Sequence, residues 1–236
     1  GSAAVLQLDM KAAASIVKRE NTRVSKLIGI NKAARTTCIK PAGTTSLVLG
    51  TSSGIHAWHN DYYIRRLRVG KNESIYNYLV KNHPELVQDE YFRPHDTAVI
   101  EIPQSAPKGS ILRTESAFDL LERVKKVATE WVKPGHRAGS NTHNVSATIS
   151  LKADDWEKAG KWMWDNRKCY NGLSVLPYDG GTYTQAPFED ITKKEFDKLV
   201  KHLQDVNLQN VVEETDETDL SGELACAGGS CEITSL

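Results

Sequence analysis

Stretches typical of β-strands alternate with stretches typical of helices along most of this 236-residue chain. Alternation of this kind predicts an α/β fold with parallel strand pairing, in which ligands bind at the carboxyl ends of the strands. The expected strands cover residues 35–39, 62–69, 97–102, 144–151 and 172–176. The expected helices cover residues 74–81, 116–132, 154–168 and the stretch after Thr192, in which Phe196, Leu199, Val200 and Leu203 would be buried.

The beginning of the chain has a different composition from this alternating body. Residues 1–34 are rich in alanine, and their apolar residues recur at helical spacing, so they predict a helical lead-in. Asn21 and Thr22 are expected to divide it into two helices. The α/β segment would then span residues 35–204.

The end of the chain, residues 205–236, is polar and acidic, and we expect a flexible tail. Residues 203–236 hold eight acidic residues and no Lys or Arg, which leaves a formal charge of +8 on residues 1–202 because the whole chain is neutral. A basic body of this kind can bind nucleic acid, bind phosphorylated small molecules, or present an ordinary solvated surface.

One loop, residues 40–46, follows the first expected strand and precedes a short helix in which Thr44 or Thr45 is a candidate N-cap. Free backbone N–H groups at a helix start, three successive hydroxyl residues and a glycine favour a phosphate. The candidate phosphate-binding residues are Ala42, Gly43, Thr44, Thr45 and Ser46. An ordinary turn between two elements is the alternative.

Cys226 and Cys231 lie near the end of the acidic tail and enclose Gly228 and Gly229. Glycines permit the tight bend that a disulfide requires, and thiols in an exposed terminal segment are available for exchange. The pair therefore predicts a mobile dithiol that carries reducing equivalents. A metal-binding tail and passive cysteines are the alternatives, and the absence of a neighbouring histidine argues against zinc.

Five motifs resemble, in order, the C-terminal part of the class II, adenosylcobalamin-dependent ribonucleotide reductases, and the terminal cysteine pair resembles the redox tail of that family. The motifs are residues 40–46, 52–56, 63–66, 144–146 and 176–187.

The resemblance implies a C-terminal portion of a ten-stranded α/β barrel and reduction of ribonucleotides to deoxyribonucleotides. It also implies that residues 42–46 bind the substrate phosphates. Cys226 and Cys231 would re-reduce an active-site disulfide and would themselves be reduced by a thioredoxin-like protein. No metal ligands are expected.

The radical cysteine of this family lies in an Asn-x-Cys-x-Glu pattern, which this chain does not contain. Cys38 and Cys169 have other neighbours. We therefore expect one piece of a split reductase, or a fragment, inactive alone and completed by a large partner chain that carries the radical cysteine and binds most of the adenosylcobalamin. The alternative is a non-catalytic regulatory module, derived from a reductase, that binds nucleotides or nucleic acid.

The apolar runs are all shorter than the roughly 20 residues that span a bilayer, and the beginning of the chain lacks a signal-peptide pattern. A cytoplasmic protein without membrane contact is the expectation, and a nucleic-acid partner is not expected for the reductase.

Overall fold

The structure is a computed structural model that describes residues 2–178, 180 and 183–213, and every structural statement below concerns those residues. They form two compact units. The first unit comprises residues 2–58 and 108–178, and the second comprises residues 59–107 together with 180 and 183–213. Both units combine helices with strands, which confirms the predicted α/β class.

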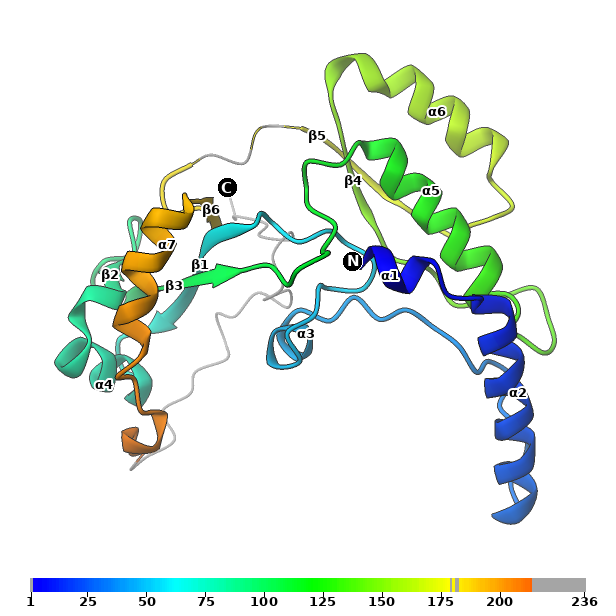
Figure 1. Cartoon of the computed structure of the whole chain (residues 1–236), viewed down its shortest axis with the longest axis horizontal. Coiled ribbons are helices and arrows are strands. Elements are labelled where there is room, and N and C mark those ends of the chain that lie inside the picture. The colour runs from blue at the N-terminus through cyan, green and yellow to red at the C-terminus, as the bar shows by residue number, and fades with distance from the viewer. Residues whose placement is uncertain (1, 179, 181–182, 214–236) are drawn as a thin grey trace. The chain divides into compact units, whose positions relative to one another are not determined.

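In the first unit, two parallel strands, β4 and β5, pair from Thr148 with Ser174 to Leu151 with Pro177. This pair confirms the expected parallel arrangement. The helices of this unit come from both of its chain segments, 2–58 and 108–178 (Figure 1). The elements of this unit are α1 (Ala3–Leu6), α2 (Met10–Leu27), α3 (Thr44–Val48), α5 (Ala117–Val127), η2 (Ala128–Val132), β4 (Thr148–Leu151), η3 (Ala153–Asp155), α6 (Trp156–Asp165) and β5 (Ser174–Pro177).

The core of the first unit forms where the apolar face of α5 packs on β4. Leu121, Val124, Ile149 and Leu151 are all at most 2% exposed. The helix begins at a capping box, in which Ser116 Oγ accepts from Asp119 N while the Asp119 carboxylate accepts from Ser116 N. The predicted helix over 116–132 is confirmed, and its last turn is the π-helical segment η2.

The helical lead-in differs from the prediction, because the break lies at Gln7–Asp9 and α2 continues through Asn21 and Thr22. Asp9 caps α2 by accepting from Ala12 N. Thr22 Oγ1 donates back to the Lys18 carbonyl within the same helix, and Asn21 Oδ1 accepts from Ala33 N. Both polar side chains therefore find partners without interrupting the helix.

The strand predicted at residues 35–39 is reduced to one bridge, between Arg35 and His136. Thr37 directs its hydroxyl to the carbonyl oxygens of Trp131 and Val132 instead, at 2.7 and 3.2 Å. A Cβ on Gly135 would lie 1.8 Å from Thr37 Oγ1, so only glycine fits there. The extended segment is thus bound to the end of η2, where the chain turns and offers no second strand.

The second unit is a four-stranded antiparallel sheet in the order β2-β3-β1-β6. The expected parallel pairing is therefore wrong for this sheet. Strands β1 and β2 run in the same direction, and each pairs antiparallel with β3. Helix α4 returns the chain between β1 and β2, and residues 90–96 reverse it between β2 and β3. Its elements are β1 (Tyr62–Gly70), α4 (Ser74–Asn82), η1 (Pro84–Leu86), β2 (Val87–Asp89), β3 (Thr97–Ser105), β6 (Phe188–Asp190), α7 (Lys193–Leu199), η4 (Val200–Leu203) and η5 (Leu208–Asn210).

A second core lies under this sheet and contains Val69, Leu79, Leu86, Ala98 and Ile100. The helix predicted after Thr192 is confirmed as α7, and Thr192 caps it with Glu195 in a second capping box. Four apolar residues in and just after α7 are only partly buried, whereas the sequence predicted that they would be buried: Phe196, Leu199, Val200 and Leu203.

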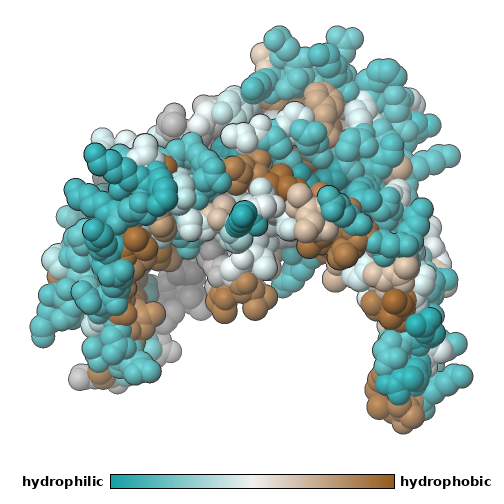
Figure 2. Space-filling view, viewed as in Figure 1, coloured by the Kyte–Doolittle hydropathy of each residue, from teal (hydrophilic) through white to brown (hydrophobic). Residues whose placement is uncertain are grey.

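In the part of the chain that the structure describes, the two sheets do not close into a barrel. None of the helices there is long and apolar enough to cross a membrane. Hydrophobic side chains remain uncovered at the end of α2 and of α3 (Figure 2), where Leu27, Ile28, Val48 and Leu49 are 62 to 81% exposed.

Candidate functional site: the 40–46 loop and the motifs around it

The loop predicted to bind phosphate leads directly into α3, which begins at Thr44. Thr44 and Thr45 are thus the first residues of the helix and not its N-cap, which corrects that detail of the prediction. The first backbone N–H groups of a helix have no partner inside it. The N–H groups of residues 44–46 therefore belong to the part of the helix that can bind an anion.

The hydroxyl groups of Ser46 and Thr45 in this loop differ in burial and in hydrogen bonding. Ser46 is buried, and its Oγ donates to the carbonyl oxygens of Ala42 and Gly43, the latter at 2.8 Å. Thr45, in contrast, is exposed. Ser46 therefore shapes the loop through its hydroxyl, whereas Thr45 can present its hydroxyl to a ligand.

The motif at residues 52–56 packs against the loop. Gly54 has a φ of +57°, and a Cβ built on it would lie 3.4 Å from the Pro41 Cα and 3.5 Å from the Lys40 carbonyl oxygen. Thr51 N donates to the Ser46 carbonyl at 2.8 Å. Two motifs that the sequence suggested separately therefore form one structural site in the first unit.

In the second unit, Arg66 binds the last two residues of the motif at 176–187. Its backbone N donates to the Pro187 carbonyl, and its Nη1 donates to the Ala186 carbonyl at 3.1 Å. The same guanidinium pairs with Glu101 and Glu189. Burial disfavours its charge, but the hydrogen bonds to the two carboxylates outweigh that effect and raise the pKa of Arg66. Arg66 is thus occupied by protein groups.

Gln185 of the same motif has a φ of +54°, which is unusual for a residue other than glycine. Its amide oxygen accepts from Tyr91 N at 2.9 Å, and its amide nitrogen donates to the Asp89 carbonyl at 2.8 Å. The left-handed backbone is therefore stabilised by two hydrogen bonds to the turn after β2. Sequence reasoning did not single out this residue.

Tyr63 and Arg65 project from the opposite face of β1 from Arg66. Burial raises the pKa of Tyr63, whose hydroxyl donates to Gln104 Oε1 at 3.1 Å. Burial also lowers the pKa of Arg65, whose guanidinium lies 5.5 Å from the centre of the Phe188 ring. The charge of Arg65 is thus held over an aromatic ring, an arrangement that stabilises the strand pairing of β1 with β6.

The cysteines divide into two groups. Cys38 and Cys169 have free thiols, and Cys38 is exposed. The predicted redox pair, Cys226 and Cys231, lies outside the described residues. In the described ranges 2–178, 180 and 183–213, no three His, Cys, Asp or Glu side chains are grouped so as to hold a metal ion.

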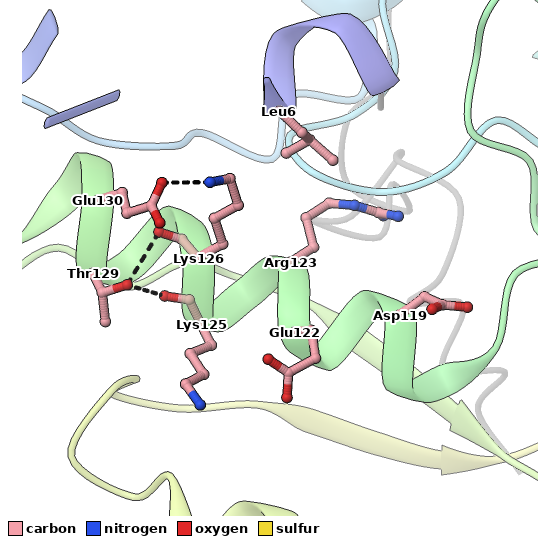
Figure 3. Close-up of a pocket in the computed structure, with 8 residues that line it drawn as sticks. All are labelled: Leu6, Asp119, Glu122, Arg123, Lys125, Lys126, Thr129 and Glu130. Carbon is pink, nitrogen blue, oxygen red and sulfur yellow. Dashed lines mark hydrogen bonds and ion pairs between the residues drawn. The ribbon is translucent and has the colours of Figure 1, made fainter. Parts of the chain in front are cut away.

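A hollow of about 480 Å³ lies beside α5 (Figure 3). Its ionic groups largely compensate one another, as in the pair of Lys126 and Glu130 at 2.5 Å. The lining residues are Leu6, Asp119, Glu122, Arg123, Lys125, Lys126, Thr129 and Glu130. Carboxylates and cations in similar numbers suit neither a phosphate nor a corrin macrocycle, so the hollow is not part of the candidate site.

Several known proteins that are similar to this chain are named as ribonucleotide reductases. A protein of Lactobacillus gasseri named adenosylcobalamin-dependent ribonucleoside-triphosphate reductase is 28% identical over 218 residues, which cover 89% of this chain and 28% of that protein. Proteins of Euglena gracilis, with the same name, and of Dictyostelium discoideum, named as a probable member, are 29% and 26% identical and cover 86% and 90% of this chain. No family model matches the chain.

A solved structure has the same fold. The crystal structure of a B-12 dependent (class II) ribonucleotide reductase superposes with a TM-score of 0.66 at 23% identity, over 85% of this chain and 28% of that one. The resemblance found in the motifs is therefore confirmed: this chain is similar to class II ribonucleotide reductases. It spans little more than a quarter of the length of these relatives.

Proposed function

We propose that this chain is part of a class II ribonucleotide reductase, an oxidoreductase that converts ribonucleotides to 2'-deoxyribonucleotides. The observation that carries the proposal is the similarity over 89% of the chain to a protein named as such a reductase. In this proposal the chain forms the C-terminal portion of a ten-stranded barrel, and its particular contributions are the phosphate site and the terminal dithiol.

The phosphate site consists of Ala42, Gly43, Thr44, Thr45 and Ser46. The backbone N–H groups at the start of α3 donate to the phosphate oxygens, and Thr45 adds its exposed hydroxyl. Ser46 keeps the loop in shape through its bonds to Ala42 and Gly43. Because the relatives are named for ribonucleoside triphosphates, we take a ribonucleoside triphosphate as the ligand.

Cys226 and Cys231 restore the active site after turnover. One thiolate attacks the active-site disulfide and forms a mixed disulfide, and the second thiolate displaces the active-site thiol. The active-site disulfide gains two electrons and two protons, and the tail pair becomes a disulfide. A thioredoxin-like dithiol protein then reduces the tail by the same exchange.

The rest of the active site comes from a partner polypeptide that carries the radical cysteine. Uncovered apolar side chains at the ends of α2 and α3 support this view, since exposed hydrophobic clusters mark surfaces that another part of an assembly covers. In this proposal the partner binds most of the adenosylcobalamin, which would supply the radical chemistry when bound.

Calorimetric titration of a ribonucleoside triphosphate, with the matching nucleoside as a phosphate-free comparison, tests the phosphate site. Thr45→Val removes the hydroxyl, and Thr45→Pro removes both the hydroxyl and one N–H of the first helical turn, where proline is tolerated. Each variant should weaken triphosphate binding about tenfold or more, the effect of a lost hydrogen bond to a charged group. Thr114→Val, another exposed threonine, is the control. Equal affinities in all variants would exclude the loop.

Turnover assays with two reductants test the dithiol. Cys226→Ser and Cys231→Ser should abolish reduction driven by a thioredoxin-like protein when the partner polypeptide is present, while a small dithiol such as dithiothreitol still supports turnover. Cys38→Ser, which removes an exposed thiol of no assigned role, is the control. Loss of activity with both reductants to the same degree would contradict the shuttle.

A further inference from the structure

Between Ser46 and His56 the chain returns to the 40–46 loop and packs on its outer side. A Cβ built on Gly54 would lie 3.4 to 3.5 Å from atoms of Ile39, Lys40 and Pro41, so the backbone at Gly54 lies close to the loop, and the positive φ of Gly54 favours glycine there. What holds this segment in place therefore also determines the shape of the 40–46 loop.

The first attachment is a buried ion pair. Arg123 on α5 donates from Nη1 to the Ile55 carbonyl at 2.9 Å and to Glu115 Oε1 at 3.0 Å, and its Nη2 pairs with Glu115 Oε2. The side chains of Arg123 and Glu115 are only 5% and 13% exposed. A guanidinium with this fork geometry binds a carboxylate and a carbonyl together, which the single ammonium of lysine does less well.

The second attachment is His56. Its Nδ1 lies 2.9 Å from the Ser53 carbonyl oxygen, and its Nε2 lies 3.2 Å from Thr148 N at the start of β4. A backbone N–H only donates and a carbonyl only accepts, so Nδ1 carries the proton and Nε2 accepts. This tautomer connects the turn at residues 53–56 to the central strand pair.

We propose that Arg123, Glu115 and His56 are positioning residues that brace residues 51–56 against the 40–46 loop and so hold the phosphate-binding conformation. Their effect on nucleotide binding rests on the function proposed above. The brace itself rests on the contacts within the first unit. Arg123 and Glu115 belong to the segment around α5, and their hydrogen bonds go to Ile55 and to each other.

The brace is tested by amide hydrogen exchange on the full chain, with four variants: Arg123→Lys, Glu115→Gln, His56→Phe and His56→Gln. The first three should make the amides of residues 42–56 exchange about tenfold faster than the general change in stability explains. Glutamine at 56 offers both a donor and an acceptor and should restore part of the protection. Arg23→Lys, in an exposed pair with Glu20 on α2, is the matched control.

The amides of β4 and β5, except that of Thr148, which donates to His56, report general stability in the same measurement. The brace is supported if the amides of residues 42–56 exchange faster while those of β4 and β5 are unchanged or are affected proportionately less. Exchange of both regions in step contradicts it, because the three residues would then act only on the whole unit.

Titration of the same variants with a ribonucleoside triphosphate separates the two proposals. If residues 42–56 loosen and the triphosphate dissociation constant rises about tenfold while that of the nucleoside stays the same, both are supported. If those residues loosen and triphosphate binding is unaffected, the brace stands and the assignment of the loop as a phosphate site is contradicted.

Discussion

Helices α2 and α5 belong to the same unit and both have apolar residues at helical spacing, yet they are used differently. Over 11 residues, α5 buries Leu121, Arg123, Val124 and Val127. Over 18 residues, α2 buries only Met10, Ala14 and Ser25. Several apolar residues of α2 remain largely exposed, among them Ile16, Val24 and Leu27, at 36 to 70% exposure.

The difference teaches that amphipathic periodicity identifies a helix without identifying what covers it. For α5 the cover is β4 in the same chain, and the periodicity predicts both the helix and its buried face. For α2 the chain supplies cover mainly at η2. The exposed remainder of its apolar face is the surface expected of a helix that packs on another part of a larger assembly.

Alanine substitutions at one leucine in each helix test the comparison with the largest expected effect. Leu121→Ala should lower the free energy of unfolding by about 2–5 kcal/mol, since it removes buried methyl groups and leaves a cavity. Leu27→Ala should change it by less than about 0.5 kcal/mol, as for other exposed positions. Urea denaturation measures both, and equal losses would mean that α2 is covered within this chain.

The N-terminal caps provide a smaller effect. Ser116→Ala removes the hydroxyl that accepts from Asp119 N and should cost about 1 kcal/mol of global stability, the usual value for a capping serine. Asp9→Ala removes the corresponding bond to Ala12 N in α2. Because α2 buries little, this second change should speed amide exchange in its first turn and leave the denaturation midpoint nearly unchanged. A similar midpoint shift in both would remove the contrast.

The cap of α5 also predicts a pH dependence. Hydrogen bonds from the Ser116 side chain and then from its backbone lower the pKa of Asp119 in the folded state. A carboxyl with a lowered folded pKa stabilises the protein above its unfolded pKa of about 3.9, and this contribution is lost as the pH falls through the folded value. Asp119→Asn should therefore be less stable than the wild type near neutral pH and approach it below pH about 4, in acid titrations followed by circular dichroism.

The smallest effect is expected on the exposed side of α2. Arg23 and Glu20 form an ion pair at 2.6 Å with side chains 60% and 55% exposed. Solvent screens such a pair, so Arg23→Ala should leave the denaturation midpoint within experimental error. A clear loss of stability would show that this face of α2 is more protected than its exposure indicates.

Much of the fold follows from local sequence signals. Thr192 and Ser116 begin helices because their hydroxyls cap them, and short runs rich in β-branched and aromatic residues place β1 and β3 close to their predicted bounds. Local sequence signals do not predict the structure where contacts with residues far along the chain determine it. Residues 35–39 are rich in β-branched residues, yet their one strand-like bridge is to His136 just after η2. The three-residue strands β2 and β6 are too short to give a pattern.

The candidate site shows the same division. The composition of residues 40–46 indicated a loop suited to phosphate, and the order of the motifs indicated a reductase. The contact of Gly54 with Pro41, the pairing of Arg123 with Glu115 and the role of Gln185 had no local signal. Arg123 lies on the buried face of α5. In the sequence it is only a charged residue among the apolar positions of that helix.

By itself, the sequence determined most of the helices and the longer strands, the cap of α7 at Thr192, and that residues 40–46 resemble a phosphate loop, because these properties depend on neighbouring residues. Only the tertiary structure decided that most strands pair in antiparallel fashion and that much of the apolar face of α2 is exposed. It also decided that His56 bonds to Thr148 and that Arg123 bonds to Ile55. Those outcomes depend on contacts between residues dozens of positions apart, whose free energies no local pattern encodes.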